Sequence, residues 1–200
     1  MKILFTGCSS TWGDELEDRL NQRYSKIVSD HYNIEEHNIA LCGISNDAII
    51  RNTIQWLENN DTDIVVLQMT VVSRREYIDR NGFFQKWSVN TIRRNSDSMM
   101  NWYYRVVQND HSDAENFYKN LFLLETYCKL KSINLVVLCW QRKKEIFDSG
   151  VWISFCKQKI QSIHELLKLN SEWDGGGHPS AENHKTIAEA VITSIDKIRN

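Results

Sequence analysis

The sequence predicts an α/β domain, a three-layer α/β/α sandwich in which helices cover both faces of a mostly parallel central sheet. Short apolar runs that suit buried strands alternate along the chain with longer segments whose apolar residues recur at helical spacing. The run at 63–68, DIVVLQ, is β-branched and apolar on both faces, as in a central strand of a parallel sheet. Parallel strands joined through helices are connected by right-handed crossovers.

The first part of the chain holds two strand–helix pairs before this central strand. Residues 2–6 form a short apolar run that ends in glycine, which predicts a buried strand. Residues 14–30 carry apolar side chains at helical spacing among charges, which predicts an amphipathic helix. The same two patterns recur as a short apolar run at 38–41 and as a segment with inward-facing isoleucines at 46–59.

The second part of the chain continues the alternation after an interruption. Between 71 and 112 the chain is rich in arginine and aromatic residues and too long for a simple crossover. We expect a lid or a partner-binding insertion there, and a helical excursion packed on the core is the alternative. A helix at 113–131 and a buried strand at 133–139 follow, and a last helix is expected from about Ser180 to Ile198, after the single proline.

Length and composition indicate one globular domain over residues 1–200. Hydrophobic residues make up 42% of the chain and charged residues 25%, so folding can bury a core without disulfide bonds. The 24 lysines and arginines nearly balance 26 acidic residues, which speaks against a nucleic-acid or membrane surface. We find no signal sequence and no run of 18 apolar residues, and therefore expect a cytoplasmic protein. The five cysteines have no zinc-site spacing.

The first candidate site is the segment 7–13, GCSSTWG, between the first expected strand and a helix. In an open parallel sheet, ligands bind beyond the carboxyl ends of the strands. The glycines permit a sharp turn, and the helix start supplies amides that favour negative charge. The spacing fits neither a P-loop nor a dinucleotide-binding motif. This setting points to Ser9 as a nucleophile, and a plain helix-capping serine is the structural alternative.

The second candidate site is the segment 174–180, DGGGHPS, about 165 residues further on. Asp174 precedes His178 closely enough for its carboxylate to fix the ring tautomer and to stabilise an imidazolium. Such a pair can activate a serine nucleophile. Of the six histidines, His178 alone stands in a setting of this kind.

Together, the two segments resemble the motifs of the SGNH (GDSL-type) hydrolase superfamily. The first family motif, Gly-Asp-Ser-x-Thr/Ser-x-Gly, matches Gly7, Ser9, Thr11 and Gly13, with Cys8 in place of the aspartate. The last motif matches Asp174, His178, Pro179, Asn183, His184, Ile187 and Ala188. The resemblance implies a flavodoxin-like α/β/α fold and a serine esterase.

The resemblance also implies a role for each matched residue. Ser9 would be the nucleophile, His178 the general base and Asp174 the residue that orients it. The amides of Ser9 and Gly43 would hold the oxyanion, because Gly43 follows a short strand where the second family motif belongs. Such a mechanism needs no metal and no organic cofactor.

The sequence departs from the family in its third motif, Gly-x-Asn-Asp, which falls on residues 70–73, TVVS. One oxyanion donor must therefore be absent or come from elsewhere. Asn46 is our first candidate because it lies near Gly43, and its alternative role is a helix cap. Gln68, Thr70 and Arg74 are the other candidates. The gap from Asp174 to His178 is also one residue longer than usual, which makes Glu172 a rival orienting residue.

The expected substrate is a small-molecule or carbohydrate ester, with an O-acetyl group on a carbohydrate as the first candidate. We expect Arg74 and Trp12 to bind it, because arginine binds carboxylates and phosphates and aromatic faces stack on sugars. A catalytically idle binding module with the same fold is an alternative that the missing asparagine favours. A nucleotide or phosphate binder would need a basic loop, for which only Arg74 and Arg75 are available.

Overall fold

The computed structural model describes residues 1–87, 102, 106, 109–140, 155–156, 159–168 and 177–200. These residues contain a five-stranded sheet in the order β2-β1-β3-β6-β7 with every neighbouring pair parallel. The strands are β1 (Ile3–Thr6), β2 (His37–Asn38), β3 (Ile64–Met69), β6 (Asn134–Cys139) and β7 (Ile160–Ser162). Numbered along the chain, this order is 2-1-3-4-5, the flavodoxin-like arrangement. The predicted fold class is confirmed.

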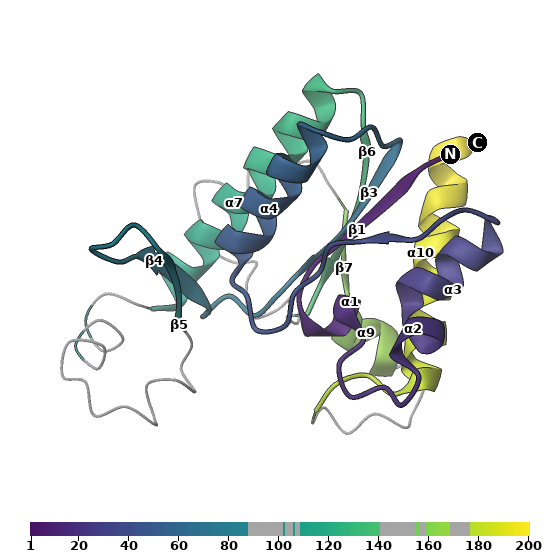
Figure 1. The fold of residues 1–200 in the computed structure, drawn as a ribbon, viewed down its shortest axis with the longest axis horizontal. Helices are drawn as coiled ribbons and strands as arrows, with labels where there is room; N and C mark the ends of the chain where they lie inside the picture. The colour runs from purple at the N-terminus through teal and green to yellow at the C-terminus, as the bar shows by residue number, and fades with distance from the viewer. Residues whose placement is uncertain (88–101, 103–105, 107–108, 141–154, 157–158, 169–176) are drawn as a thin grey trace.

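Helices cover both faces of the sheet (Figure 1). On one face lie α4 (Asn46–Leu57) and α7 (Asp110–Leu130), which pack against each other. On the other face, α10 (Ala181–Arg199) packs against α3 (Tyr24–His31) and α9 (Ile163–Lys168). The short helices α1 (Ser9–Trp12) and α2 (Arg19–Gln22) lie between β1 and α3 in the chain. The domain therefore has the expected three layers.

The central strand β3 separates two apolar cores. Val65, Leu67 and Met69 belong to the core under α4 and α7, whereas Ile64 and Val66 belong to the core under α3 and α10. All six residues of β3 are buried. Alternate side chains of a strand point to opposite faces, so a strand covered on both sides is apolar along most of its length. The one polar residue of β3, Gln68, accepts hydrogen bonds.

Polar side chains set the first residues of the long helices. The hydroxyl of Ser45 accepts a hydrogen bond from the Ala48 amide at the start of α4. The hydroxyl of Ser180 accepts one from the Asn183 amide at the start of α10. Each cap satisfies an amide that has no partner within its helix. The helix expected after Pro179 therefore begins where the sequence places it.

The predicted helix at 14–30 is wrong in its extent, because two helices occupy this region. Arg23 has an extended backbone between α2 and α3, and its guanidinium is paired with Glu36 at 2.6 Å. The helix α3 begins at Tyr24, whose amide donates to Nδ1 of His184 on α10 at 3.1 Å. These tertiary contacts override the local amphipathic pattern.

The strand expected at 38–41 is shorter and begins one residue earlier, at His37. The side chain of Asn38 donates to the carbonyl of Thr11 at 2.8 Å and accepts from the amide of Ala40 at 3.0 Å. The backbone amides of Ile39 and Leu41 still donate to the carbonyls of Phe5 at 3.0 Å and of Gly7 at 3.2 Å, so the chain stays beside the β1 segment as far as Leu41. The strand β7 and the helix α9 were not predicted, because segments of three and six residues are too short for periodicity to reveal.

The described part of segment 71–112 contains an antiparallel hairpin of β4 (Arg75–Ile78) and β5 (Phe84–Trp87). The hairpin forms a separate sheet that projects from the main domain (Figure 1). Most of the rest of this segment lies outside the described residues, so the lid or partner-binding role stays a prediction. Among the described helices, none combines the length and apolarity needed to cross a membrane.

Candidate active site

A cleft lies where β1, β3 and β6 end. It has a volume of about 140 Å³ and is lined by Cys8, Ser9, Ser10, Thr70, Val71, Arg74, Trp140, Gly177 and His178. The cleft lies at the carboxyl ends of the strands, where parallel sheets bind ligands. A larger hollow of about 410 Å³ lies beside the amino end of β6, between α7 and α10, and shares no lining residue with the cleft.

Two predicted catalytic residues, Ser9 and His178, line this cleft together. Ser9 is 6% exposed, and its hydroxyl lies 3.8 Å from the thiol of Cys8. No hydrogen bond joins Ser9 to His178 among the described contacts. Catalytic hydrogen bonds are often long in the absence of substrate and form when it binds.

Ser9 is presented by a crowded turn that is held by Gln68 of β3. The side-chain oxygen of Gln68 accepts hydrogen bonds from the Cys8 amide at 3.1 Å and from the Thr11 hydroxyl at 3.2 Å. A Cβ on Gly7 would lie 2.4 Å from the Thr11 hydroxyl oxygen and 2.8 Å from Cβ of Gln68. Only glycine fits at this position. Gln68, itself fully buried, therefore positions the turn and does not reach the cleft.

The amide of Ser9 is available at the start of α1. Cys8 is the residue before this helix, and its carbonyl accepts from the amides of Thr11 and Trp12, each at 3.0 Å. Within the described part of the chain, the Ser9 amide has no hydrogen-bond acceptor. It is thus free to donate to a ligand in the cleft.

His178 is held by an acidic residue that sequence reasoning missed. The backbone N–H of His178 donates to Oε2 of Glu15 at 3.2 Å, and its Nδ1 lies 3.2 Å from Oε1 of the same carboxylate. Its Nε2 lies 3.8 Å from Oδ2 of Asp14. The contacts with the ring and backbone of His178 hold the pKa of Glu15 below its ordinary value. Asp174 and Glu172 lie outside the described residues.

Gly43 lies in the exposed loop between β2 and α4. Its backbone is left-handed, with φ +72°, and a Cβ there would meet no atom within 4 Å. The neighbouring Cys42 is close to Asp14: burial, and next the charge of Asp14, raise the pKa of the Cys42 thiol to about 11. This loop therefore lies on the His178 side of the molecule. Gly43 does not line the cleft in the described structure, and its oxyanion role stays a prediction.

Of the two roles expected for Asn46, the helix cap is wrong, and the oxyanion role is not supported by the contacts of its side chain. The helix cap is Ser45, and Asn46 is the first residue of α4. Its side chain is 1% exposed and bonds to the backbone of Thr70, donating to the carbonyl at 3.3 Å and accepting from the amide at 2.8 Å. The paired amide group is buried at Thr70 and does not line the cleft. Asn46 therefore positions the segment after β3.

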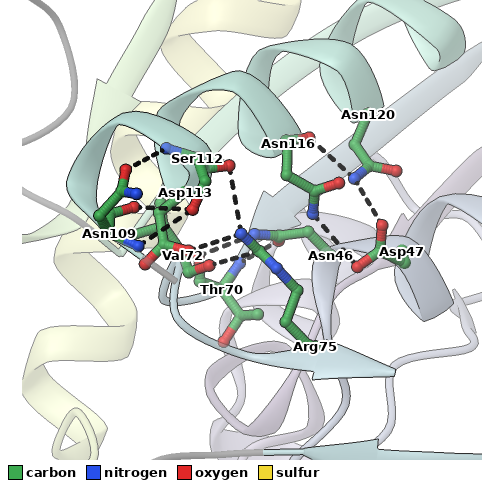
Figure 2. A network of polar contacts seen from close by, with 10 residues as sticks. All are labelled: Asn46, Asp47, Thr70, Val72, Arg75, Asn109, Ser112, Asp113, Asn116 and Asn120. Atoms are coloured by element: carbon green, nitrogen blue, oxygen red, sulfur yellow. Dashed lines mark hydrogen bonds and ion pairs between the residues drawn. The ribbon is translucent and has the colours of Figure 1, made fainter. Parts of the chain in front are cut away.

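Figure 2 shows the contact of Asn46 with Thr70 inside a larger polar network. The network ties the segment after β3 to α4 and α7, so buried polar groups find partners. Arg75 donates to the carbonyl of Val72 at 2.8 Å and pairs with Asp113 at 2.5 Å. The other members of the network are Asp47 of α4, Asn109 just before α7, and Ser112, Asn116 and Asn120 of α7.

Two of the alternative oxyanion candidates, Thr70 and Arg74, do line the cleft. Arg74 donates from Nη1 to the Thr70 hydroxyl oxygen at 2.9 Å. A hydroxyl that accepts a hydrogen bond still carries its own O–H, and this O–H has no acceptor within the described part of the chain. Thr70 directly follows β3 and is the first residue of segment 70–73, on which the family's third motif falls.

The substrate-binding role expected for Trp12 is not supported by the described structure. Trp12 does not line the cleft, and the guanidinium of Arg19 lies 4.1 Å from the centre of its ring. The aromatic residue that does line the cleft is Trp140, which the sequence analysis did not single out. Trp140 directly follows the buried strand β6, so the rule that ligands bind at strand ends could have identified it.

The second histidine of the matched motif, His184, has a structural role. It is fully buried, its Nδ1 accepts from the Tyr24 amide, and its ring stacks on the ring of Tyr24. Burial, aided by the charge of His178, lowers the pKa of His184 to about 4. Among the described residues, no group of histidine, cysteine and acidic side chains is arranged to hold a metal ion.

No protein-family model and no curated protein matches the sequence, but solved structures share its fold. A psychrotrophic esterase from Pseudoalteromonas sp., inhibited by monoethylphosphonate, has a TM-score of 0.62 at 14% identity, over 99% of this chain and 98% of its own. A G-D-S-L family lipolytic protein from Desulfitobacterium hafniense has a TM-score of 0.60 at 14% identity, and the match covers 96% of this chain and 98% of that protein. An acetyl xylan esterase from Butyrivibrio proteoclasticus has a TM-score of 0.53 at 11% identity, and the match covers 98% of this chain and 63% of that protein. The chain therefore has the SGNH-type hydrolase fold.

Proposed function

We propose that the protein is a serine esterase, with Ser9 as its nucleophile and His178 as its general base. The observation that carries this proposal is the shared cleft, into which two distant parts of the chain bring a serine and a histidine. Esterases with the same fold support ester hydrolysis as the general reaction. The substrate we propose is a small-molecule or carbohydrate ester, such as an O-acetylated sugar.

In the proposed first step, Oγ of Ser9 bonds to the carbonyl carbon of the ester while His178 takes the hydroxyl proton. The tetrahedral intermediate then collapses, the bond to the alcohol oxygen breaks, and the alcohol leaves with the proton from His178. Water attacks the acyl-enzyme, again giving a proton to His178, and the acid and free Ser9 are released. Each proton that His178 accepts is returned within the cycle.

The negative charge on the carbonyl oxygen needs donors aimed into the cleft. We assign this task to the amides of Ser9 and Gly43 and to the hydroxyl of Thr70. Two observations support this assignment: the Ser9 amide has no acceptor among the described residues, and the Thr70 hydroxyl oxygen accepts from Arg74. Thr70 thus stands in for the asparagine that segment 70–73 lacks. Removal of one oxyanion donor typically lowers turnover by about 10²–10³-fold.

We weigh two carboxylates first as the residue that orients His178, with Glu172 kept as the rival of Asp174. Asp174 is the one that the family resemblance implies, and we keep it as the partner of the imidazole during catalysis. Glu15 makes the shorter of the two carboxylate contacts with His178 among the described residues, at 3.2 Å against 3.8 Å for Asp14. A carboxylate beside the ring fixes its tautomer and stabilises the imidazolium that forms when Ser9 loses its proton.

The test is an assay with p-nitrophenyl acetate and with a fluorophosphonate probe, followed by mass spectrometry of the adduct. We expect the probe on Ser9, and we expect Ser9→Ala to lower turnover by about 10⁴-fold or more. Ser10→Ala is the matched control, because Ser10 is a buried serine that lines the same cleft. A probe on Ser10 with none on Ser9 would overturn the assignment.

A catalytically idle binding module is the second candidate. Two observations favour it: segment 70–73 has no asparagine, and no hydrogen bond joins Ser9 to His178 among the described contacts. This candidate predicts no hydrolysis of short esters and no labelling of Ser9, together with saturable ligand binding that Ser9→Ala leaves intact. The two assays therefore separate the candidates.

A further inference from the structure

Arg74 differs from the arginine next to it in having no carboxylate partner within the described chain. Arg75 is paired with Asp113 at 2.5 Å. The guanidinium of Arg74 makes a single hydrogen bond, to the Thr70 hydroxyl oxygen at 2.9 Å, although it is partly buried. Withdrawing a cation from water without a counter-ion is unfavourable, so such a group is typical of a site that a ligand completes.

The position of Arg74 is fixed by its contacts with the segment that follows β3. Its hydrogen-bond partner, Thr70, is held through both backbone polar groups by the buried side chain of Asn46. The amide of Arg74 donates to the carbonyl of Val71 at 3.3 Å, which closes a turn. The guanidinium is thus anchored at one nitrogen, and its remaining N–H groups are unpaired within the described structure. Anchored groups lose little freedom when a ligand binds.

The charge of the cleft also favours an anion. Of its nine lining residues, Arg74 is cationic and none is acidic. The carboxylates of Asp14 and Glu15 contact His178 without lining the cleft. The N–H groups of a guanidinium lie in pairs that match the two oxygens of a carboxylate.

We propose that the substrate is an anionic ester, whose carboxylate or similar oxyanion pairs with Arg74 while its carbonyl meets Ser9. This inference rests on the proposed esterase function and narrows the substrate class. Neutral esters would leave the guanidinium without a partner. The anionic group can belong to either the acid or the alcohol part of the ester, and matched substrates distinguish the two.

The test compares anionic esters with their neutral amides. 4-Acetoxybenzoate and 4-acetoxybenzamide differ in charge on the alcohol side, and monomethyl succinate and methyl succinamate differ on the acyl side. In at least one pair, we expect kcat/KM of the anionic ester to exceed that of the neutral one by about 10-fold or more. In Arg74→Gln, the ratio of the two kcat/KM values should fall to about one. Arg80→Gln, which removes an exposed arginine of the hairpin turn, should preserve it.

Two results would overturn the inference. One is a ratio near one for both pairs in the wild-type protein. The other is an equal loss of kcat/KM for both members of a pair in Arg74→Gln, which would make the guanidinium an oxyanion donor.

If none of the esters is hydrolysed, the esterase proposal fails by itself. Calorimetric titration of the Ser9→Ala protein with the same compounds then still tests the role of Arg74. Tighter binding of the anionic member, lost in Arg74→Gln, is the expected result, and equal binding contradicts the inference.

Discussion

Glu15 contacts His178 at two points, through a hydrogen bond from the backbone N–H at 3.2 Å and an approach to Nδ1 of the ring at 3.2 Å. Its backbone is left-handed, with φ +66°, which is uncommon for a residue other than glycine. Gly177, next to His178, is also left-handed, with φ +69°. Glycine adopts this conformation without strain, so the strain lies at Glu15. Such strain often accompanies functional sites, which supports a role for the contact in positioning His178.

Replacement of Glu15 by glutamine should test this contact, because the amide keeps the size of the side chain and removes its charge. We expect kcat for p-nitrophenyl acetate to fall by about 5-fold with KM unchanged, a modest loss because the carboxylate is exposed to solvent. Glu17→Gln, at an exposed acid two residues further on, is the control. An unchanged kcat in Glu15→Gln would limit Glu15 to a structural role.

Asp174 should have the larger effect if it is the partner of the imidazole. Asp174→Asn is expected to leave folding intact and to lower kcat by about 10⁴-fold, because the amide favours the wrong tautomer of His178. Glu172→Gln is the matched variant, since Glu172 is the rival carboxylate before the three glycines. Full activity of Asp174→Asn together with loss in Glu172→Gln would transfer the role to Glu172.

Most of the fold could be predicted because the alternation of buried strands and amphipathic helices is a local pattern. The strands β1, β3 and β6 follow apolar runs, and the helices α4, α7 and α10 follow apolar stripes with polar caps. The break between α2 and α3 could not be predicted. It depends on His184, which accepts from the Tyr24 amide across 160 residues of sequence. Contacts of this kind leave no periodic signal.

In the candidate site, too, some residues could be predicted from the sequence and others depend on contacts between distant segments. Ser9 and His178 stand at strand and helix ends next to glycines, and the structure places both in one cleft. Glu15 could not be predicted, because its contact with His178 depends on the left-handed backbones of Glu15 and Gly177. Residue type alone does not encode these conformations. The orientation of Asn46 depends on Thr70, which becomes its neighbour only when α4 packs beside β3.

The new role of Asn46 predicts a loss of stability larger than that of a missing helix cap. Asn46→Ala leaves the buried amide and carbonyl of Thr70 without their partner, so we expect the free energy of unfolding to fall by about 2–4 kcal/mol. Ser45→Ala, which removes the cap, should cost about 1 kcal/mol. Urea unfolding measures both. Unchanged stability with a 10²-fold loss of turnover in Asn46→Ala would instead make Asn46 an oxyanion donor.

His184 predicts how stability depends on pH. Its pKa falls from 6.5 to about 4 on folding, because the neutral ring is buried. Between these values the unfolded chain binds a proton that the folded chain does not, so stability falls as the pH is lowered from 6.5 towards 4, by about 3 kcal/mol in all. Urea unfolding at several pH values should show this slope, and His184→Gln, which can still accept from the Tyr24 amide, should reduce it. The exposed His111→Gln is the control, and an equal slope in all three proteins would contradict the assignment.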